Sequence, residues 1–167
     1  MKKENFFAIL HNIRSCYNVG SIFRIADAVS IDKLYLTGYT PSPDENQKIT
    51  KTALGAENSV KYEKVKNLKK LIEKLKREGF KIIALETTKD AISYFNFVPK
   101  FPLALIVGNE VRGIDKRRLK KCDLILKIPM AGKKESLNVA VAFAIVAYYI
   151  RVKTKFEKFF KTKKSSI

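Results

Sequence analysis

Five polar residues in three separate stretches have the types and spacing that suit binding and chemistry on a charged ligand. The first stretch carries an amide and, six residues later, a guanidinium group, which holds phosphate through two parallel hydrogen bonds. The second carries a carboxylate soon after a glycine. The third places a hydroxyl and an amide at the start of a helix, where unpaired backbone N–H groups can serve a ligand. The five residues are Asn18, Arg24, Glu110, Ser136 and Asn138.

Each stretch also has a plainer structural interpretation. Arg24 can form a surface ion pair with Asp27, and it lies about one and two-thirds helical turns from Asn18, so the two do not share a face. The residue types just before Glu110 are common in tight turns from strand to helix. Hydroxyl and amide side chains are common helix caps. Considered separately, the three stretches favour these structural roles.

The segment at residues 126–150 is the most unusual in the chain. An apolar strand leads through a polar, glycine-bearing loop into a helix at residues 139–150, whose only polar side-chain groups are two tyrosine hydroxyls. A helix that is apolar all round must be covered on more than one side, and this one is too short to span a bilayer. We therefore expect the chain, or a second subunit, to wrap around it.

Short apolar stretches alternate with helical patterns, which is typical of an α/β domain whose mostly parallel sheet is flanked by helices. Strands are expected at residues 6–10, 33–37, 60–65, 80–85, 103–107 and 124–128. Helices are expected at residues 18–29, 48–58, 67–78, 115–121 and 139–150. Ligands bind such sheets at the carboxyl ends of the strands, which favours the loops after Leu85, Val107 and Pro129.

The charge balance indicates a polyanionic partner. The chain has 34 Lys and Arg residues against 16 Asp and Glu residues, a net charge of +18. Nucleic acid is the first expectation for such a basic protein, although a lysine-rich surface alone gives the same balance. We expect one domain at residues 1–151 and a basic tail at residues 152–167. The phenylalanines of the tail either pack on the domain or stack on bases.

Other classes of function find little support. His11 is the only histidine, and Cys16 and Cys122 lie far apart without metal-ligand spacing, so no metal is expected and the thiols are expected to be reduced in the cytoplasm. The glycine patterns of dinucleotide-binding and Walker loops are absent, which weakens a dehydrogenase interpretation. The apolar run near the amino terminus is too short for a signal peptide, and no membrane association is expected.

Taken together, three blocks of sequence resemble the SpoU (TrmH-type) branch of the SPOUT superfamily of RNA 2′-O-ribose methyltransferases. The blocks are NIRSCYNVGSIFRIADAV at residues 12–29, LALIVGNEVRGID at residues 103–115 and LKIPMAGKKESLNVAVAFAIVAYY at residues 126–149. KTALGAE at residues 51–57 resembles a further element of the family. The second block departs from the family where Val111 and Arg112 follow the glutamate, a place that often holds glycine or another small residue.

The resemblance, which covers roughly residues 6–151, implies a fold, a cofactor and an oligomeric state. The fold would be an α/β domain with a deep trefoil knot near its carboxyl terminus, an exception to the rule against knots. The cofactor would be S-adenosylmethionine, held in the knot by three loops, and the protein would be a homodimer that packs partly through its last helix. Backbone groups match the positions that line the cofactor pocket at Leu85, Gly108, Ile128, Met130 and Leu137.

The resemblance also implies roles for the five polar residues in methylation of an RNA ribose 2′-hydroxyl. Arg24 would act on the active site of the partner subunit, clamping phosphate and stabilising the developing alkoxide. A guanidinium pKa above about 12 makes Arg24 a poor general base, so a phosphate oxygen or water would take the proton. Asn18 and Ser136 would position the substrate or Arg24, while Glu110 and Asn138 would hold the pocket loops.

The resemblance implies that RNA binds the dimer surface itself, because the catalytic fold begins almost at the first residue. Transfer RNA is the first expected substrate and ribosomal RNA the second. The candidate contacts are Lys2, Lys3, residues 116–121 and the basic tail. The alternative is a non-catalytic RNA-binding protein that kept the knotted scaffold, but the intact Arg24 and Glu110 argue against it.

Overall fold

The computed structural model describes residues 4–164, with side chains described through Thr154. It is built on a seven-stranded sheet in the order β3-β2-β1-β6-β4-β7-β5, in which every pair of neighbouring strands is parallel. The strands are β1 (Phe6–His11), β2 (Lys33–Thr37), β3 (Tyr62–Val65), β4 (Lys81–Leu85), β5 (Ile92–Ser93), β6 (Leu103–Val107) and β7 (Leu124–Lys127). The expected α/β class with a mostly parallel sheet is confirmed.

The helices lie between the strands as the periodicity predicted. They are α1 (Cys16–Ala28), α2 (Gln47–Ala53), α3 (Ala56–Ser59), α4 (Leu68–Arg77), the 3₁₀ turn η1 (Tyr94–Asn96), α5 (Lys116–Leu119) and α6 (Val139–Lys164). The expected single helix at residues 48–58 is instead two short helices. Leu54 and Gly55 between them have φ angles of 51° and 91°, so the backbone is left-handed there and the first helix cannot continue.

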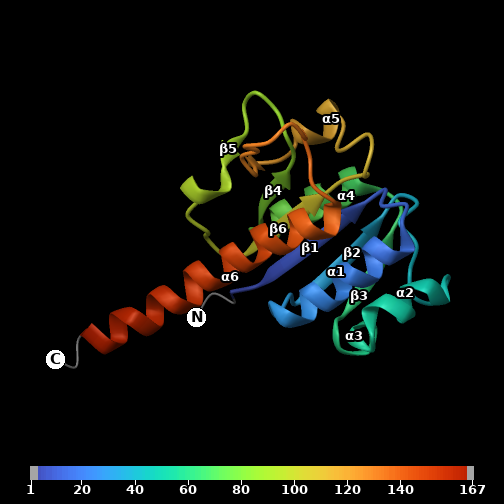
Figure 1. The fold of residues 1–167 in the computed structure, drawn as a ribbon, viewed down its shortest axis with the longest axis horizontal. Coiled ribbons are helices and arrows are strands. Elements are labelled where there is room, and N and C mark those ends of the chain that lie inside the picture. Colours follow the sequence, from blue (N-terminus) through green and yellow to red (C-terminus); the bar gives the residue numbers. More distant parts are fainter. Residues whose placement is uncertain (1–3, 165–167) are drawn as a thin grey trace.

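Helices cover both faces of the sheet, as Figure 1 shows. α1 and α6 lie on one face, where Phe23 and Phe143 belong to the same apolar cluster as Leu105 of the sheet. α4 lies on the other face, where Leu75 packs with Ile106. Leu105 and Ile106 are consecutive residues of β6 and point to opposite faces. This two-sided burial explains why β6 reads as an unbroken apolar run.

The strand order brings distant loops to one edge of the sheet. β6 lies between β1 and β4, and β7 lies between β4 and β5. Because all the strands are parallel, the loops after β1, β4, β6 and β7 leave the same edge, at their carboxyl ends. This is the edge at which a ligand site was expected.

The rest of the chain covers only one face of α6. Phe143, Val146, Ala147 and Ile150 are completely buried. Val141, Tyr148 and Val152 are exposed, with Val141 and Tyr148 at 49% and 48%. Their spacing of seven and four residues places them on one face of the helix. The expectation that one small domain would not cover this helix on all sides is therefore correct for the single chain.

α6 does not end at the predicted boundary between domain and tail but runs through to Lys164. Arg151 and Lys153 lie on either side of this predicted boundary, and the side chains of both pack against the domain. Arg151 Nε donates to the carbonyl oxygen of Val29 at 2.8 Å, and its guanidinium lies over the rings of Phe6 and Phe101. Arg151 therefore fastens α6 to the end of α1.

The domain boundary itself stays a prediction. Lys2 and Lys3, and the tail side chains beyond Thr154, lie outside the described residues. Among residues 4–164, no helix has the length and apolar character needed to cross a membrane.

Candidate active site

Glu110 joins the loop after β6 to the start of α1. Its Oε2 accepts a hydrogen bond from the backbone N–H of Arg14 at 3.0 Å. Its Oε1 accepts from the backbone N–H of Ser15 and from the side-chain amide of Asn18, both at 3.0 Å. One carboxylate thus satisfies three donors at the beginning of a helix, where backbone N–H groups lack partners within the helix.

The hydrogen bonds to Glu110 keep it ionised. Partial burial, the largest single contribution, would raise the pKa of this carboxyl group, because burial disfavours the charged form. The backbone N–H groups of Arg14 and Ser15 and the amide of Asn18 act in the opposite direction and prevail, so the pKa of Glu110 lies below its ordinary value. At neutral pH the residue is therefore an acceptor only and cannot donate a proton.

Asn18 also reaches the start of α6. Its Oδ1 accepts a hydrogen bond from the side-chain amide of Asn138 at 3.0 Å. Asn138 in turn caps α6, because its Oδ1 accepts from the backbone N–H groups of Ala140 and Val141 at 2.9 and 3.3 Å. Glu110, Asn18 and Asn138 therefore form a chain of hydrogen bonds that joins the loop after β6, the first turn of α1 and the start of α6. The capping interpretation of Asn138 is also correct.

Asn109 and Tyr39 extend this network, and the sequence did not single them out. The side-chain amide of Asn109 donates to the backbone oxygen of Asn12 at 2.9 Å and to the hydroxyl of Tyr39 at 3.0 Å. Its Oδ1 accepts from the backbone N–H groups of Val111 and Arg112. The burial of Asn109 is the signal that marks it, and burial of a polar residue is not readable from the local pattern.

A cavity of about 180 Å³ lies beside this network. Its walls come from the loops after β4, β6 and β7, and all five positions expected to bind cofactor line it: Leu85, Gly108, Ile128, Met130 and Leu137. Glu110 and Ser136 line it as well. The structure thus brings together, around one cavity, residues that are up to 57 positions apart along the chain, from Leu85 to Ala142.

The loop after β6 folds back closely on itself at Gly108. A Cβ atom at this position would lie 2.5 Å from Cγ1 of Ile114 and 2.7 Å from the backbone carbon of Gly113, distances too short for any side chain. Glu86, another residue that the sequence did not single out, holds the same loop, because its Oε2 accepts from the backbone N–H of Ile114 at 2.8 Å. The glycine therefore serves close packing of two turns.

The charges around the cavity differ from those of the protein as a whole. The ionisable side chains that line it are Glu86, Glu110, Glu135 and Lys127, three acids and one base, in a chain whose net charge is +18. The apolar side chains of Val107, Ile128 and other lining residues supply the remaining walls. Such a lining suits a ligand that carries positive charge and an apolar or aromatic part.

The loop between β7 and α6 contributes Met130, Glu135, Ser136 and Leu137 to the lining of the cavity. Within the described chain, no hydrogen bond joins residues 129–137 to another residue. Pro129 starts this stretch and has no N–H group. Ser136 belongs to it and makes no side-chain hydrogen bond there, so its hydroxyl acts as neither cap nor brace. Groups of this kind need water or a ligand as partner.

Arg24 does not join the other four polar residues. Its side chain is exposed on α1 and lines a shallow surface hollow with Leu54 and Gly55, away from the cavity. Within the described residues it forms no ion pair with Asp27, whose Oδ1 accepts a hydrogen bond from the hydroxyl of Ser59 at 2.7 Å instead. The surface ion pair considered for Arg24 is therefore absent.

The described part of the chain contains no cluster of three or more His, Cys, Asp or Glu side chains placed to hold a metal ion. Cys16 and Cys122 are free and half-buried. Burial raises the pKa of the Cys122 thiol to about 11, so this thiol is protonated and a weak nucleophile at neutral pH.

Comparison with known proteins places this geometry in a family. Residues 5–148 match the model of the SpoU rRNA Methylase family. A Bacillus subtilis protein named as a TrmH family tRNA/rRNA methyltransferase, YacO, is 32% identical over 153 residues, which are 89% of this chain and 59% of that protein. The chain thus spans less than two thirds of the length of this curated relative.

Solved structures share the fold. A TrmH/SpoU tRNA modifying enzyme from A. aeolicus has a TM-score of 0.82 and 28% identity, over 96% of this chain and 80% of that one. The SpoU methyltransferase AviRb from Streptomyces viridochromogenes, in complex with AdoMet, has a TM-score of 0.84. It is 23% identical, over 92% of this chain and 62% of that one, a likeness of fold.

Proposed function

The chain belongs to the SpoU rRNA Methylase family, and we propose that it is an S-adenosylmethionine-dependent RNA methyltransferase that modifies a ribose 2′-hydroxyl. The observation that carries this proposal is the cavity between the loops after β4, β6 and β7. It is acidic in a protein of net charge +18, and the hydrogen-bond chain of Glu110, Asn18 and Asn138 lies at its rim.

The residues around the cavity fit S-adenosylmethionine. The apolar walls at Leu85, Ile128 and Met130 suit an adenine ring, and the backbone groups of residues 135–137, which make no hydrogen bond within the described chain, suit its polar edge. The carboxylates of Glu86 and Glu135 balance a sulfonium charge. When bound, S-adenosylmethionine supplies a methyl group on a cationic sulfur, so the transfer itself removes a charge.

The remaining polar residues would position the RNA and stabilise negative charge on the 2′-oxygen. Glu110 holds the backbone of Arg14 and Ser15, which fixes Asn18 at the rim of the cavity. We propose that Asn18 and Ser136 position the ribose. Arg24 of the partner subunit would clamp a phosphate and stabilise negative charge on the 2′-oxygen as its proton leaves to a phosphate oxygen or water.

A homodimer is part of the proposal. Two observations support it: the exposed apolar stripe of α6 at Val141, Tyr148 and Val152, and the distance of Arg24 from the cavity of its own chain. An exposed apolar stripe of this kind marks an interaction surface. A second copy packed on α6 would cover the stripe, and it would bring a second Arg24 to the assembly.

We also propose the trefoil knot. β7 is inserted between β4 and β5, and the chain then returns through residues 129–137 to α6. On α6, the hydroxyl oxygen of Tyr149 lies 2.8 and 2.9 Å from the backbone oxygens of Phe95 and Phe97, and its single proton can be donated to either. The connection between β5 and β6 is therefore held against α6, as a chain threaded through that connection requires.

The substrate we propose first is transfer RNA, with ribosomal RNA second. The A. aeolicus enzyme is a tRNA modifying enzyme, and the name of the Bacillus protein includes both RNA classes. We further propose a cytoplasmic location, which the two free thiols support.

The test is transfer of tritiated methyl groups from S-adenosylmethionine to total RNA, followed by mapping of the labelled nucleotide. We expect a single labelled 2′-O-methyl nucleotide in transfer RNA. Calorimetry with S-adenosylmethionine, and competition by S-adenosylhomocysteine, distinguishes the enzyme from the alternative, a non-catalytic RNA-binding protein. A protein that binds RNA but gives no heat with either compound is a binding module, and the enzyme proposal would then be wrong.

A further inference from the structure

A second, larger hollow lies on the other side of the loop that carries Glu110. We define the arginine groove as the hollow of about 650 Å³ lined by Arg14, Cys16, Tyr39, Pro41, Asn46, Asn109, Val111 and Arg112. Asn109 and Val111 line both this groove and the acidic cavity. The two hollows therefore share one wall, and a chain lying in the groove passes directly beside the site proposed for methyl transfer.

The charge of the groove is opposite to that of the cavity. Its lining includes two arginines and no acidic residue. Within the described residues, neither Arg14 nor Arg112 forms an ion pair, and the carboxylate of Glu110 already accepts four hydrogen bonds. Two unpaired guanidinium groups on one small surface favour a ligand with phosphate groups.

Tyr39 provides an aromatic surface in the same groove. It is 56% exposed, yet it is fixed at both ends. Its hydroxyl accepts from the side-chain amide of Asn109, and its backbone N–H donates to Oδ1 of Asn12 at 3.2 Å. The second bond needs glycine at position 38, where φ is +65° and a Cβ atom would lie 1.8 Å from Oδ1 of Asn12.

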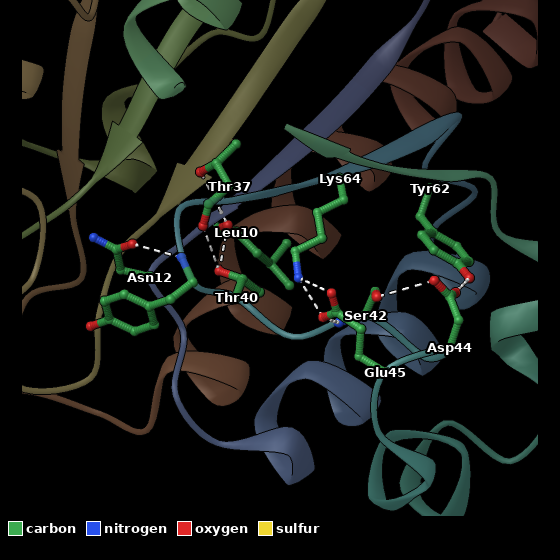
Figure 2. A network of polar contacts seen from close by, with 10 residues as sticks. Leu10, Asn12, Thr37, Thr40, Ser42, Asp44, Glu45, Tyr62 and Lys64 are labelled. Carbon is green, nitrogen blue, oxygen red and sulfur yellow. Dashed lines mark hydrogen bonds and ion pairs between the residues drawn. The ribbon is translucent and has the colours of Figure 1, made fainter. Parts of the chain in front are cut away.

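The loop that presents Tyr39 is held firmly in other places, as Figure 2 shows. The hydroxyl oxygen of Thr40 lies 2.9 Å from the backbone oxygens of both Leu10 and Thr37, and its single proton can be donated to either. Further along the loop, Glu45 pairs with Lys64. An exposed aromatic ring on a rigid loop binds a flat partner with little loss of conformational entropy.

We propose that the arginine groove binds a nucleotide next to the methylated one in single-stranded RNA, with Tyr39 stacking on its base and Arg14 and Arg112 contacting phosphates. Base stacking on an aromatic side chain together with arginine contacts to the backbone is the usual mode of single-strand recognition. Val111, which is 83% exposed on the shared wall, adds apolar surface beside the base. The inference rests on the proposed RNA substrate and names a part of its recognition.

A tryptophan reporter tests the stacking. The chain contains no tryptophan, so Tyr39→Trp places the only indole of the full-length protein in the groove. We expect a single-stranded RNA 12-mer of mixed sequence to quench its fluorescence, because the base stacks on the indole. Long-chain polyphosphate, a polyanion without bases, should bind without quenching. Equal quenching by both, or quenching by neither, would overturn the proposal.

Substitutions test the groove independently of the reporter. Tyr39→Ala should weaken binding of the RNA 12-mer by roughly fivefold or more, since stacking is lost. Arg112→Gln should lower the salt dependence of binding by about 0.7 in the slope of log K against log salt, the value for one phosphate contact of a single strand. Arg77→Gln, the same charge change at an exposed position of α4 outside the groove, should leave the slope unchanged.

Equal slopes for the Arg112→Gln and Arg77→Gln variants would contradict the proposal. The binding measurements need no S-adenosylmethionine, so they stand apart from the activity. Quenched fluorescence without methyl transfer would support the proposed groove and contradict the proposed enzyme activity. Methyl transfer without quenching would support the proposed enzyme activity and contradict the proposed groove.

Discussion

Asn18 and Asn138, which are 120 residues apart in the sequence, are joined by a side-chain hydrogen bond of 3.0 Å. The bond connects the first turn of α1 to the N-terminal cap of α6, so it ties the first block of the family pattern to the third. Glu110, from the second block, completes the connection through Asn18. The polar residues of three distant blocks therefore support one another at the rim of one cavity.

We expect Glu110→Gln to destabilise the protein and to reduce methyl transfer. Both carboxylate oxygens accept from N–H groups. In glutamine an NH₂ group replaces one of these oxygens, so this NH₂ group would face an N–H donor and a hydrogen bond would be lost. The free energy of unfolding should fall by about 1–2 kcal/mol, less than for a fully buried charged acceptor, because the site is partly open to solvent. Chemical denaturation at a fixed protein concentration measures this.

Glu135→Gln is the matched control for this substitution. It makes the same chemical change in a residue that lines the same cavity, but Glu135 makes no hydrogen bond within the described residues. Its unfolding curve should match that of the unaltered protein. Equal stability of the Glu110→Gln variant and the control would show that the bonds to Glu110 contribute nothing.

Gly108→Ala should disturb the cofactor cavity, because the added methyl group would press on Ile114 and on the backbone of Gly113. We expect affinity for S-adenosylmethionine to fall at least tenfold, which corresponds to about 1.4 kcal/mol. Gly132→Ala is the control from another loop near the cavity, where a Cβ atom would meet nothing within 4 Å. Calorimetric titration of both variants with S-adenosylmethionine decides the matter, and similar affinities would refute the steric argument.

Arg24→Ala should abolish methyl transfer while leaving cofactor affinity nearly unchanged, because Arg24 does not line the cavity of its own chain. Mixing this variant with the Gly108→Ala variant tests action across the dimer. In a mixed dimer, the intact cavity of one subunit meets the intact Arg24 of the other. Activity should therefore return after the two variants are unfolded and refolded together. A mixture as inactive as its parents would mean that Arg24 acts within its own subunit.

We expect the protein to lose stability in mild acid because of His11. Its ring is buried, with Nδ1 2.9 Å from the hydroxyl of Thr37 and Nε2 3.1 Å from the amide of Asn12. Burial, with a smaller contribution from Arg118, lowers the pKa of His11 from 6.5 to about 4. Because the folded state resists protonation, this stabilisation is complete above pH 6.5 and is lost as the pH falls toward 4.

The free energy of unfolding should fall by about 3 kcal/mol over this range through His11 alone. His11→Asn keeps an amide that can donate to Thr37 but cannot titrate, so its stability should depend less on pH. Urea denaturation of both proteins between pH 7 and 4 provides the comparison. Parallel curves for the two would rule out His11 as the source.

Truncation after Thr154 should weaken binding of transfer RNA and reduce its salt dependence. It removes Lys155, Lys158, Lys161, Lys163 and Lys164 but keeps Arg151 and Lys153, which pack on the domain. Each lost phosphate contact should reduce the slope of log K against log salt by about 0.7–0.9, the values for single strands and for a DNA duplex. An unchanged slope in filter-binding measurements would show that the tail does not contact phosphate.

The sequence alone determined most elements of the fold, but not β5, the η1 turn or the break between α2 and α3. Runs such as Leu103–Val107 and the amphipathic pattern of α4 depend on the local alternation of apolar and polar residues, so their strands and helices were predictable. The five positions that the family resemblance implied also line one hollow, four of them from the second and third blocks and Leu85 from outside the blocks. Their roles in binding the cofactor stay a prediction.

Only the tertiary structure decided how the polar residues combine. The contacts of Asn109 with Tyr39, and of Arg151 with the end of α1, join segments far apart in the chain, and no local pattern records such pairs. The left-handed turn at Leu54 was equally hidden, because the fold holds this residue in a conformation that leucine rarely adopts. Local periodicity is a property of neighbouring residues, whereas a hydrogen bond such as that between Asn18 and Asn138 exists only once the sheet has brought its loops to one edge.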